Sequence, residues 1–123
     1  MVNLKKLKLM RVISGKLKGR AIHISKKESY RPTLSRIRED LFNLIKHNSI
    51  LNISLSDCIF VDLFCGSGSI GIEALSQGAK KVIFNDKDKD NLVYIKNFIL
   101  KTGLQNYELH SCNSYDENLS ILE

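Results

Sequence analysis

Three glycines and two aspartates have spacings that suit the binding of a nucleotide-like ligand. Gly66, Gly68 and Gly71 form the pattern G-x-G-x-x-G directly after an apolar segment; Asp62 precedes them, and Asp86 ends the next apolar segment. Glycines in such a turn let the backbone approach a ligand, and a helix N-terminus offers free N–H groups. A carboxylate at the end of the next strand can accept both hydroxyl groups of a ribose. The pattern predicts a ligand-binding turn, although helix–strand packing alone would also account for the glycines.

The position of Asp62 discriminates between two ligand classes. A pyrophosphate docks at the first glycine of a dinucleotide-binding turn, and an adjacent carboxylate would repel it. S-adenosylmethionine has no phosphate and carries two cationic groups, an α-ammonium and a sulfonium, so a carboxylate there is favourable. The sequence favours the methyl donor over NAD. The alternatives left open are that Asp62 caps a turn or helix and that Asp86 is a solvated acid at a strand end.

The segments around these residues alternate between strand and helix patterns. The run C-I-F-V-D-L-F (58–64) is apolar apart from one acid, as expected of a strand buried on both faces of a parallel sheet. We expect further strands at 81–86 and 107–111, with helices at 69–77 and 88–101 between them. Leu92, Ile95 and Ile99 would form the buried face of the second helix. This order is typical of half a doubly wound α/β sheet.

The first third of the chain has a different pattern. Two short strands are expected at 11–14 and 19–24, with Gly15 and Gly19 in the turn between them. A helix over 34–47 follows, with Thr33 as its N-cap and one apolar face. That face comprises Leu34, Ile37, Leu41, Leu44 and Ile45, and Ile50, Leu51 and Ile53 should touch the core. We divide the chain into residues 1–29, an extension with a basic hairpin, and residues 30–123, the α/β domain.

Charge separates the same two regions. Residues 1–50 hold thirteen lysines and arginines against three acids, whereas residues 51–123 hold six lysines against ten acids. A basic arm on a mildly acidic body indicates a polyanion-binding element, and a solvated lysine-rich surface is the alternative. The chain has no apolar run long enough to cross a membrane, and its three cysteines and three histidines lack metal-ligand spacing. We expect a cytoplasmic protein without a metal.

Three blocks of sequence resemble the family of small-subunit ribosomal RNA guanine-N2 methyltransferases (the RsmD family). They are R-V-I-S-G-K-L-K-G-R (11–20), R-P-T-L-S-R-I-R-E-D-L-F-N (31–43) and D-L-F-C-G-S-G-S-I-G-I-E-A-L-S-Q-G-A (62–79). The resemblance covers residues 11–115. It implies the N-terminal half of a Rossmann-like S-adenosylmethionine-dependent methyltransferase fold, preceded by a basic β-hairpin. It also implies methylation of a guanine N2 in 16S rRNA.

The resemblance assigns the cofactor to particular residues. The turn from Asp62 through Phe64, Gly66 and Ser67 to Gly68 would hold its methionine end, and Asp86 its ribose. Asn113 stands where the family has an acid for the adenine amino group. Because an amide oxygen accepts this hydrogen bond without charge, adenine binding should be weakened.

The family's catalytic loop, Asp/Asn-Pro-Pro-Tyr/Phe after the fourth strand, has no counterpart in this sequence. The only proline is Pro32, and the chain ends before a fourth strand. Catalytic residues are therefore unknown, and we expect no methyl transfer by this chain alone. The alternatives are a non-catalytic remnant that binds cofactor or RNA and, disfavoured by Asp62, a dinucleotide-binding module.

The basic blocks are predicted to bind the substrate, 16S rRNA or a precursor of the small ribosomal subunit. Cationic side chains close to one another can contact successive phosphates. Arg36 and Arg38 could instead pair with Glu39 and Asp40. The predicted RNA-contacting residues are Arg11, Lys16, Lys18 and Arg20 on the hairpin and Arg31, Arg36 and Arg38 near the following helix.

Overall fold

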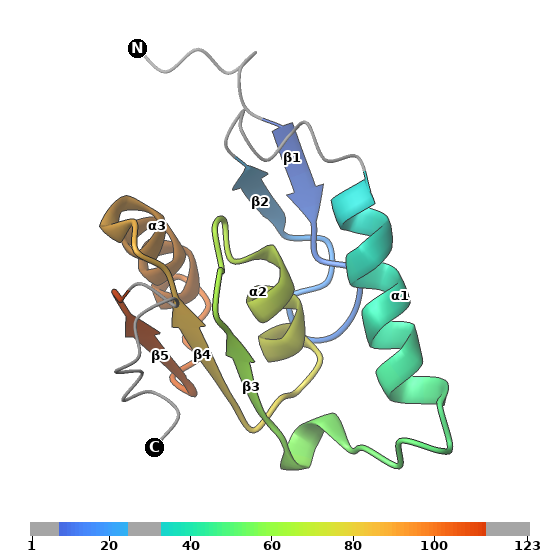
Figure 1. Ribbon diagram of the computed structural model, residues 1–123. Helices are drawn as coiled ribbons and strands as arrows, with labels where there is room; N and C mark the ends of the chain where they lie inside the picture. Colours follow the sequence, from blue (N-terminus) through green and yellow to red (C-terminus); the bar gives the residue numbers. More distant parts are fainter. Residues whose placement is uncertain (1–7, 25–32, 113–123) are drawn as a thin grey trace.

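The chain folds into a small parallel sheet flanked by helices, with a separate two-stranded hairpin (Figure 1). The computed structural model describes residues 8–24 and 33–112. Its elements are β1 (Lys8–Arg11), β2 (Ala21–Ile24), α1 (Thr33–His47), the 3-10 turn η3 (Leu55–Asp57), β3 (Ile59–Asp62), α2 (Ser69–Ser76), β4 (Lys81–Asn85), α3 (Lys89–Leu100) and β5 (Tyr107–His110). The predicted alternation of strand and helix from residue 58 onward is confirmed.

The sheet has the order β3-β4-β5, and both neighbouring pairs are parallel. Phe60 of β3 is in register with Val82, and Phe84 with Leu109 of β5, so these apolar side chains share one face of the sheet. Helix α2 packs on this face, since a Cβ added to Gly71 would lie 2.3 Å from the Phe84 ring. The carboxyl ends of the strands, where ligands bind in open α/β sheets, therefore lie beside the start of α2.

The predicted buried face of α3 is confirmed, and that of α1 is confirmed in part, since Leu41 and Ile45 pack against the core. Ile37 and Leu44 are 54% and 49% exposed, whereas Phe42 is buried and its ring stacks on Phe60 at 6.0 Å. Arg38 takes the other inward position, one turn before Phe42. The apolar pattern alone could not predict that Arg38 is buried, because its burial depends on a carboxylate partner on α2. Ile50, Leu51 and Ile53, expected to touch the core, are also exposed.

The hairpin strands lie further apart in the sequence than we predicted. They pair antiparallel from Lys8↔Ile24 to Arg11↔Ala21, so the first strand ends at Arg11 instead of continuing to residue 14. Residues 12–20 form the connection, in which Val12 N–H donates to the Arg20 carbonyl at 3.0 Å. The strand stops because the backbone N–H groups of Ile13 and Ser14 find partners on α2 instead of on β2.

No helix among residues 8–24 and 33–112 is both long enough and apolar enough to cross a membrane.

Candidate functional site

The glycine turn between β3 and α2 needs glycine for two separate reasons. Gly66 and Gly68 have φ values of 52° and 81°, in the left-handed region that side chains disfavour. Gly68 is also the N-cap residue of α2, and a Cβ there would lie 2.7 Å from Cγ1 of Ile95 on α3. The turn is thereby pressed against α3, and its N–H groups lie at the carboxyl edge of the sheet, as a ligand-binding turn requires.

Asp86 lies directly against this turn. Its Oδ2 accepts a hydrogen bond from the Gly66 N–H at 2.8 Å, and Asn91 Nδ2 on α3 is 3.4 Å from the same oxygen. Its Oδ1 accepts from the Asp88 N–H at 2.9 Å. The structure thus brings the carboxylate after β4 and the turn after β3 into contact. Because a carboxylate has about four acceptor positions, these bonds leave capacity for a ligand hydroxyl.

Asp62, Phe64 and Ser67 complete the predicted methionine-binding segment on the β3 side. Asp62 is the last residue of β3, in register with Phe84, and is half-buried. Ser67 is buried within the turn, whereas Phe64 is 63% exposed. All the described members of the predicted cofactor set therefore lie at the ends of β3 and β4. Asn113, the predicted adenine contact, lies outside the described residues.

Asn85 holds the end of β4 to both of its neighbours and was not identified from the sequence. It is fully buried, and its Nδ2 donates to the Leu63 carbonyl at 2.9 Å and to the Cys112 carbonyl at 3.1 Å. Its Oδ1 accepts from the Cys112 N–H at 3.3 Å. A polar residue at the end of an apolar strand was the available signal, since a buried amide must find partners. Asn85 fixes the backbone immediately before the predicted adenine contact.

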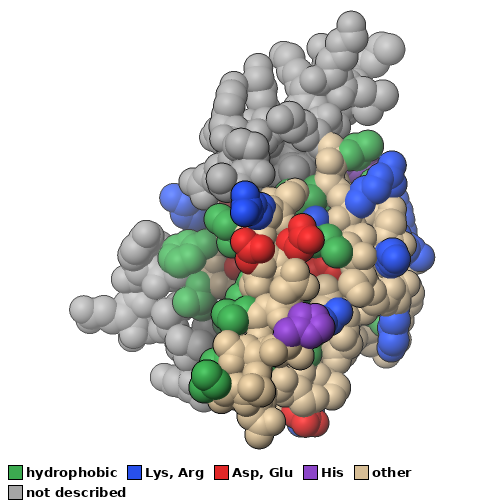
Figure 2. Space-filling view, turned by 90° about the vertical axis from the view of Figure 1, so that its right-hand side faces the viewer, with side chains coloured by type: hydrophobic (Ala, Val, Ile, Leu, Met, Phe, Trp, Pro, Cys, Tyr) green, Lys and Arg blue, Asp and Glu red, His purple; other side chains and the backbone are tan. Residues whose placement is uncertain are grey.

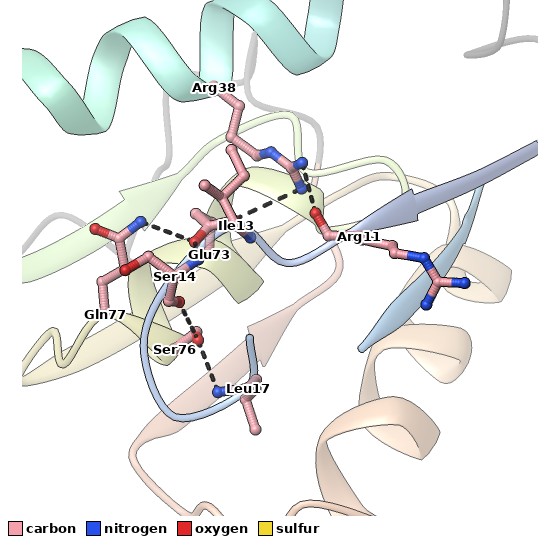
Figure 3. Close-up of polar contacts among 8 residues, drawn as sticks. All are labelled: Arg11, Ile13, Ser14, Leu17, Arg38, Glu73, Ser76 and Gln77. Atoms are coloured by element: carbon pink, nitrogen blue, oxygen red, sulfur yellow. Dashed lines mark hydrogen bonds and ion pairs between the residues drawn. The ribbon is translucent and has the colours of Figure 1, made fainter. Parts of the chain in front are cut away.

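A buried carboxylate on α2 holds the connection of the hairpin (Figure 3). Glu73 is fully buried, and its oxygens accept from the Ile13 N–H at 2.7 Å, the Ser14 N–H at 3.1 Å and the Gln77 side chain at 2.8 Å. Sequence reasoning missed this role of Glu73. The signal was a charged residue within the otherwise small and apolar segment 69–76, where it must be paired if buried.

Ser76 binds the same connection one turn further along α2. Its Oγ donates to the Ser14 carbonyl at 2.6 Å and accepts from the Leu17 N–H at 2.9 Å (Figure 3). Its own carbonyl accepts from the Lys16 N–H at 2.9 Å. The first sequence block of the resemblance is therefore a docking segment for the helix that follows the glycine turn, which ties the orientation of the hairpin to the candidate cofactor site.

Arg38 was predicted to contact RNA, and the structure instead buries it. Its side chain is 2% exposed; Nη1 lies 3.8 Å from Glu73 Oε1, and Nη2 donates to the Arg11 carbonyl at 2.8 Å. Burial lowers the pKa of the Arg38 guanidinium, while the Glu73 and Glu39 carboxylates act in the opposite direction. Because Glu73 offers a buried countercharge, Arg38 packs inward, and it leaves the set of predicted RNA contacts.

The other predicted RNA contacts within the described residues are exposed. Arg11, Lys16, Lys18 and Arg20 lie on the hairpin and its connection, where Arg11 Nη1 also donates to the Gly19 carbonyl at 3.0 Å. Arg36 forms an exposed ion pair with Asp40 at 4.0 Å, one of the pairings left open by the sequence. Arg31 lies outside the described residues.

The side of the molecule seen in Figure 2 carries acidic, hydrophobic and histidine side chains in its centre, and most of its lysines and arginines gather along the right-hand edge. The described part of the chain contains no group of three or more histidine, cysteine, aspartate or glutamate side chains that could hold a metal.

Comparison with known families gives one matching model, described as conserved hypothetical protein 95, over residues 10–121. The ribosomal RNA small subunit methyltransferase D of Haemophilus influenzae is 44% identical over 80 residues, which are 65% of this chain and 38% of that protein. The protein of the same name from Buchnera aphidicola is 33% identical over 109 residues, 89% of this chain and 53% of the relative. The chain thus spans about two fifths to a half of these relatives.

Solved structures resemble the fold over most of the chain. The "putative methyltransferase yhhF" of Escherichia coli gives a TM-score of 0.70 at 24% identity, over 87% of this chain and 54% of that one. A "putative methylase" of Haemophilus influenzae gives a TM-score of 0.66 at 30% identity and covers 89% of this chain and 55% of its own. These similarities confirm the predicted Rossmann-like methyltransferase fold class.

Proposed function

Because the chain belongs to the family described as conserved hypothetical protein 95, and resembles the N-terminal portion of small-subunit methyltransferases D, we propose that it binds S-adenosylmethionine for the methylation of ribosomal RNA. The observation that carries this proposal is the contact between Asp86 and the Gly66 N–H. This contact places Asp86, the proposed ribose-binding carboxylate, against the glycine turn. The turn itself follows a second carboxylate, Asp62.

The charged and hydrogen-bonding groups at the carboxyl edge of the sheet suit the chemistry of S-adenosylmethionine. Asp62 and the turn would hold the cationic methionine part, Asp86 would accept a hydrogen bond from the ribose, and Asn113 would accept one from the adenine amino group. When bound, the cofactor supplies an electrophilic methyl group. The residues of this chain would bind the cofactor and orient it. Asn85 connects the ends of the neighbouring strands and so keeps the cofactor-binding groups in fixed positions.

The finer proposal is that the methyl acceptor is a guanine N2 of 16S rRNA. That nitrogen is a poor nucleophile because its lone pair is delocalised into the ring, so orientation of the base contributes most of what a protein can supply. The base would have to leave its stack to reach the carboxyl edge of the sheet. None of the residues proposed to bind the cofactor would orient this base.

Substrate RNA would be bound by the exposed cations of the hairpin. Lys16 and Lys18 lie in the connection that Glu73 and Ser76 hold on α2, so these charges are carried by a fixed backbone. Each phosphate contact should contribute about 0.7–0.9 to the slope of log K against log salt. If Lys16→Gln/Lys18→Gln binds RNA with an unchanged slope, these lysines belong to the solvated surface.

Calorimetry with S-adenosylmethionine, S-adenosylhomocysteine and NAD tests the cofactor. We expect the first two to bind and Asp86→Ala to weaken binding by about 1–3 kcal/mol, the typical cost of losing a charged hydrogen-bonding partner. Asp57→Ala removes an exposed acid of η3, before the start of β3, and serves as the matched control. Tighter binding of NAD would reject the methyltransferase proposal in favour of a dinucleotide module. Equal losses in the two variants would remove Asp86 from the site.

A further inference from the structure

A groove of about 450 Å³ lies between the hairpin and α3. One wall is formed by β2 and Arg20, the residue before it. The other wall is formed by the second half of α3 and Lys101, the residue after it. The lining residues used below are Arg20, His23, Tyr94, Asn97, Phe98 and Lys101. None of the lining residues in the described part of the chain is acidic, and two of them are cationic, so the chemistry of the groove favours an anionic ligand.

The groove combines flat apolar rings with cations. Tyr94 and Phe98 are one turn apart on α3, both are partly buried against the core, and Lys101 continues the same side of the helix. Arg20 faces them from the hairpin and is exposed. Aromatic faces stack on unpaired bases while lysines and arginines contact the phosphates between them, the combination used by proteins that bind single-stranded nucleic acid.

The hairpin wall of this groove is held in place from both ends. The Tyr94 hydroxyl accepts a hydrogen bond from the His23 N–H at 2.6 Å, and the His23 and Tyr94 rings meet edge to face at 6.5 Å. At the other end, Glu73 binds the N–H groups of Ile13 and Ser14. The hairpin wall of the groove is therefore attached to α3 at one end and to α2 at the other.

The groove also begins close to the candidate cofactor site. Asn91, whose side chain lies 3.4 Å from Asp86 Oδ2, is three residues, slightly less than one helical turn, before Tyr94 on α3. One helical turn advances about 5.4 Å along the axis. A single-stranded nucleic acid lying in the groove along α3 would therefore run toward the glycine turn.

We propose that the groove between β2 and α3 binds a single-stranded segment of the RNA next to the methylated base, with a base on Tyr94 and Phe98 and phosphates at Arg20 and Lys101. This inference rests on the proposed function, since it names the surface that holds that substrate. It differs from the hairpin proposal because three of the four contact residues lie on α3 or at its C-cap, outside the basic arm.

The test uses a fluorescently labelled single-stranded RNA of about ten nucleotides, bound to the full chain and followed by anisotropy at several salt concentrations. Arg20→Gln/Lys101→Gln should weaken binding about tenfold and reduce the salt slope by about 1.4, the value for two single-strand contacts. Lys46→Gln/Lys80→Gln makes the same change in net charge at two exposed lysines outside the groove and should leave both quantities nearly unchanged. Equal effects of the two pairs would overturn the groove proposal.

The stacking contact has its own readout. Phe98→Leu keeps an apolar side chain at this position but removes the flat ring, so affinity should fall about fivefold or more while the salt slope is unchanged. Ultraviolet crosslinking of the RNA should give an adduct on Tyr94 or Phe98, and an adduct only on the hairpin would overturn the groove. If the protein binds S-adenosylmethionine but no RNA, the rRNA substrate in the proposed function fails as well. If RNA binds and only Lys16→Gln/Lys18→Gln weakens it, the groove fails alone.

Discussion

The guanidinium of Arg38 on α1 lies 3.8 Å from the carboxylate of Glu73 on α2, and both side chains are removed from solvent. The same two groups bind the hairpin, Arg38 through the Arg11 carbonyl and Glu73 through the N–H groups of Ile13 and Ser14. One buried ion pair therefore connects α1, the hairpin connection and the helix that follows the glycine turn.

Removal of Arg38 should be costly because it leaves the Glu73 carboxylate buried without its countercharge. We expect Arg38→Met to lower the free energy of unfolding by about 3–5 kcal/mol, in the range for breaking a buried pair. Arg36→Met removes the exposed partner of Asp40 on the same helix and should cost about 1 kcal/mol or less. Denaturant unfolding of the two variants measures this difference, and comparable losses would contradict a structural role for the buried pair.

Gly15 and Gly19 in the hairpin connection share a backbone conformation that disfavours side chains, but they differ in the space available for a Cβ atom. Both have positive φ, 93° and 85°, so alanine at either position should cost about 1–2 kcal/mol. A Cβ on Gly15 would also lie 2.0 Å from the Ser76 carbonyl oxygen, whereas nothing lies within 4 Å of one on Gly19. Gly15→Ala should therefore be less stable than Gly19→Ala by about a further 1–3 kcal/mol.

Amide hydrogen exchange shows where that difference arises. In Gly15→Ala, the N–H groups of Lys16 and Leu17 should exchange faster, because their acceptors on Ser76 move away. Unaltered protection of these amides would mean that the connection accommodates the side chain without leaving α2.

Tyr94 should make stability depend on alkaline pH. Burial raises the pKa of its phenol, although the hydrogen bond from the His23 N–H acts in the opposite direction. As pH rises through the ordinary tyrosine value of about 10, Tyr94 ionises first in the unfolded state. Its contribution to stability is therefore complete below that pH and is lost as pH rises toward the folded-state pKa.

Absorbance titration and unfolding at several pH values measure this effect. Tyr94→Phe should remove a late-titrating phenol and reduce the fall in stability above pH of about 10. Tyr107→Phe changes a tyrosine on β5 and is the control. If the loss of stability is the same in both variants and the parent chain, Tyr94 does not control it.

A polypeptide of residues 1–123 is expected not to transfer methyl groups by itself. Its only proline is Pro32, so it lacks the Pro-Pro loop that the resemblance implies for presenting the guanine. Methyl incorporation into undermethylated small-subunit rRNA, with a full-length relative as positive control, checks this. Turnover by the isolated polypeptide would contradict the argument from the missing loop.

The order of elements from residue 58 onward and the place of the glycine turn could both be predicted from the amino-acid sequence. Leu92, Ile95 and Ile99 were correctly placed on one buried face because helical period alone decides which side chains align. The proximity of Asp86 to the turn also followed from sequence, since the carboxyl ends of adjacent parallel strands meet at one edge of the sheet.

Only the tertiary structure decided which charged and polar residues are buried. Arg38 and Arg36 are two residues apart on one helix, yet one pairs inside with Glu73 and the other in solvent with Asp40. Glu73 likewise ended β1 at Arg11 by taking the backbone N–H groups that a longer strand would have used. Local periodicity carries no information about a partner contributed by a distant segment, and the cost of burying a charge depends almost entirely on that partner.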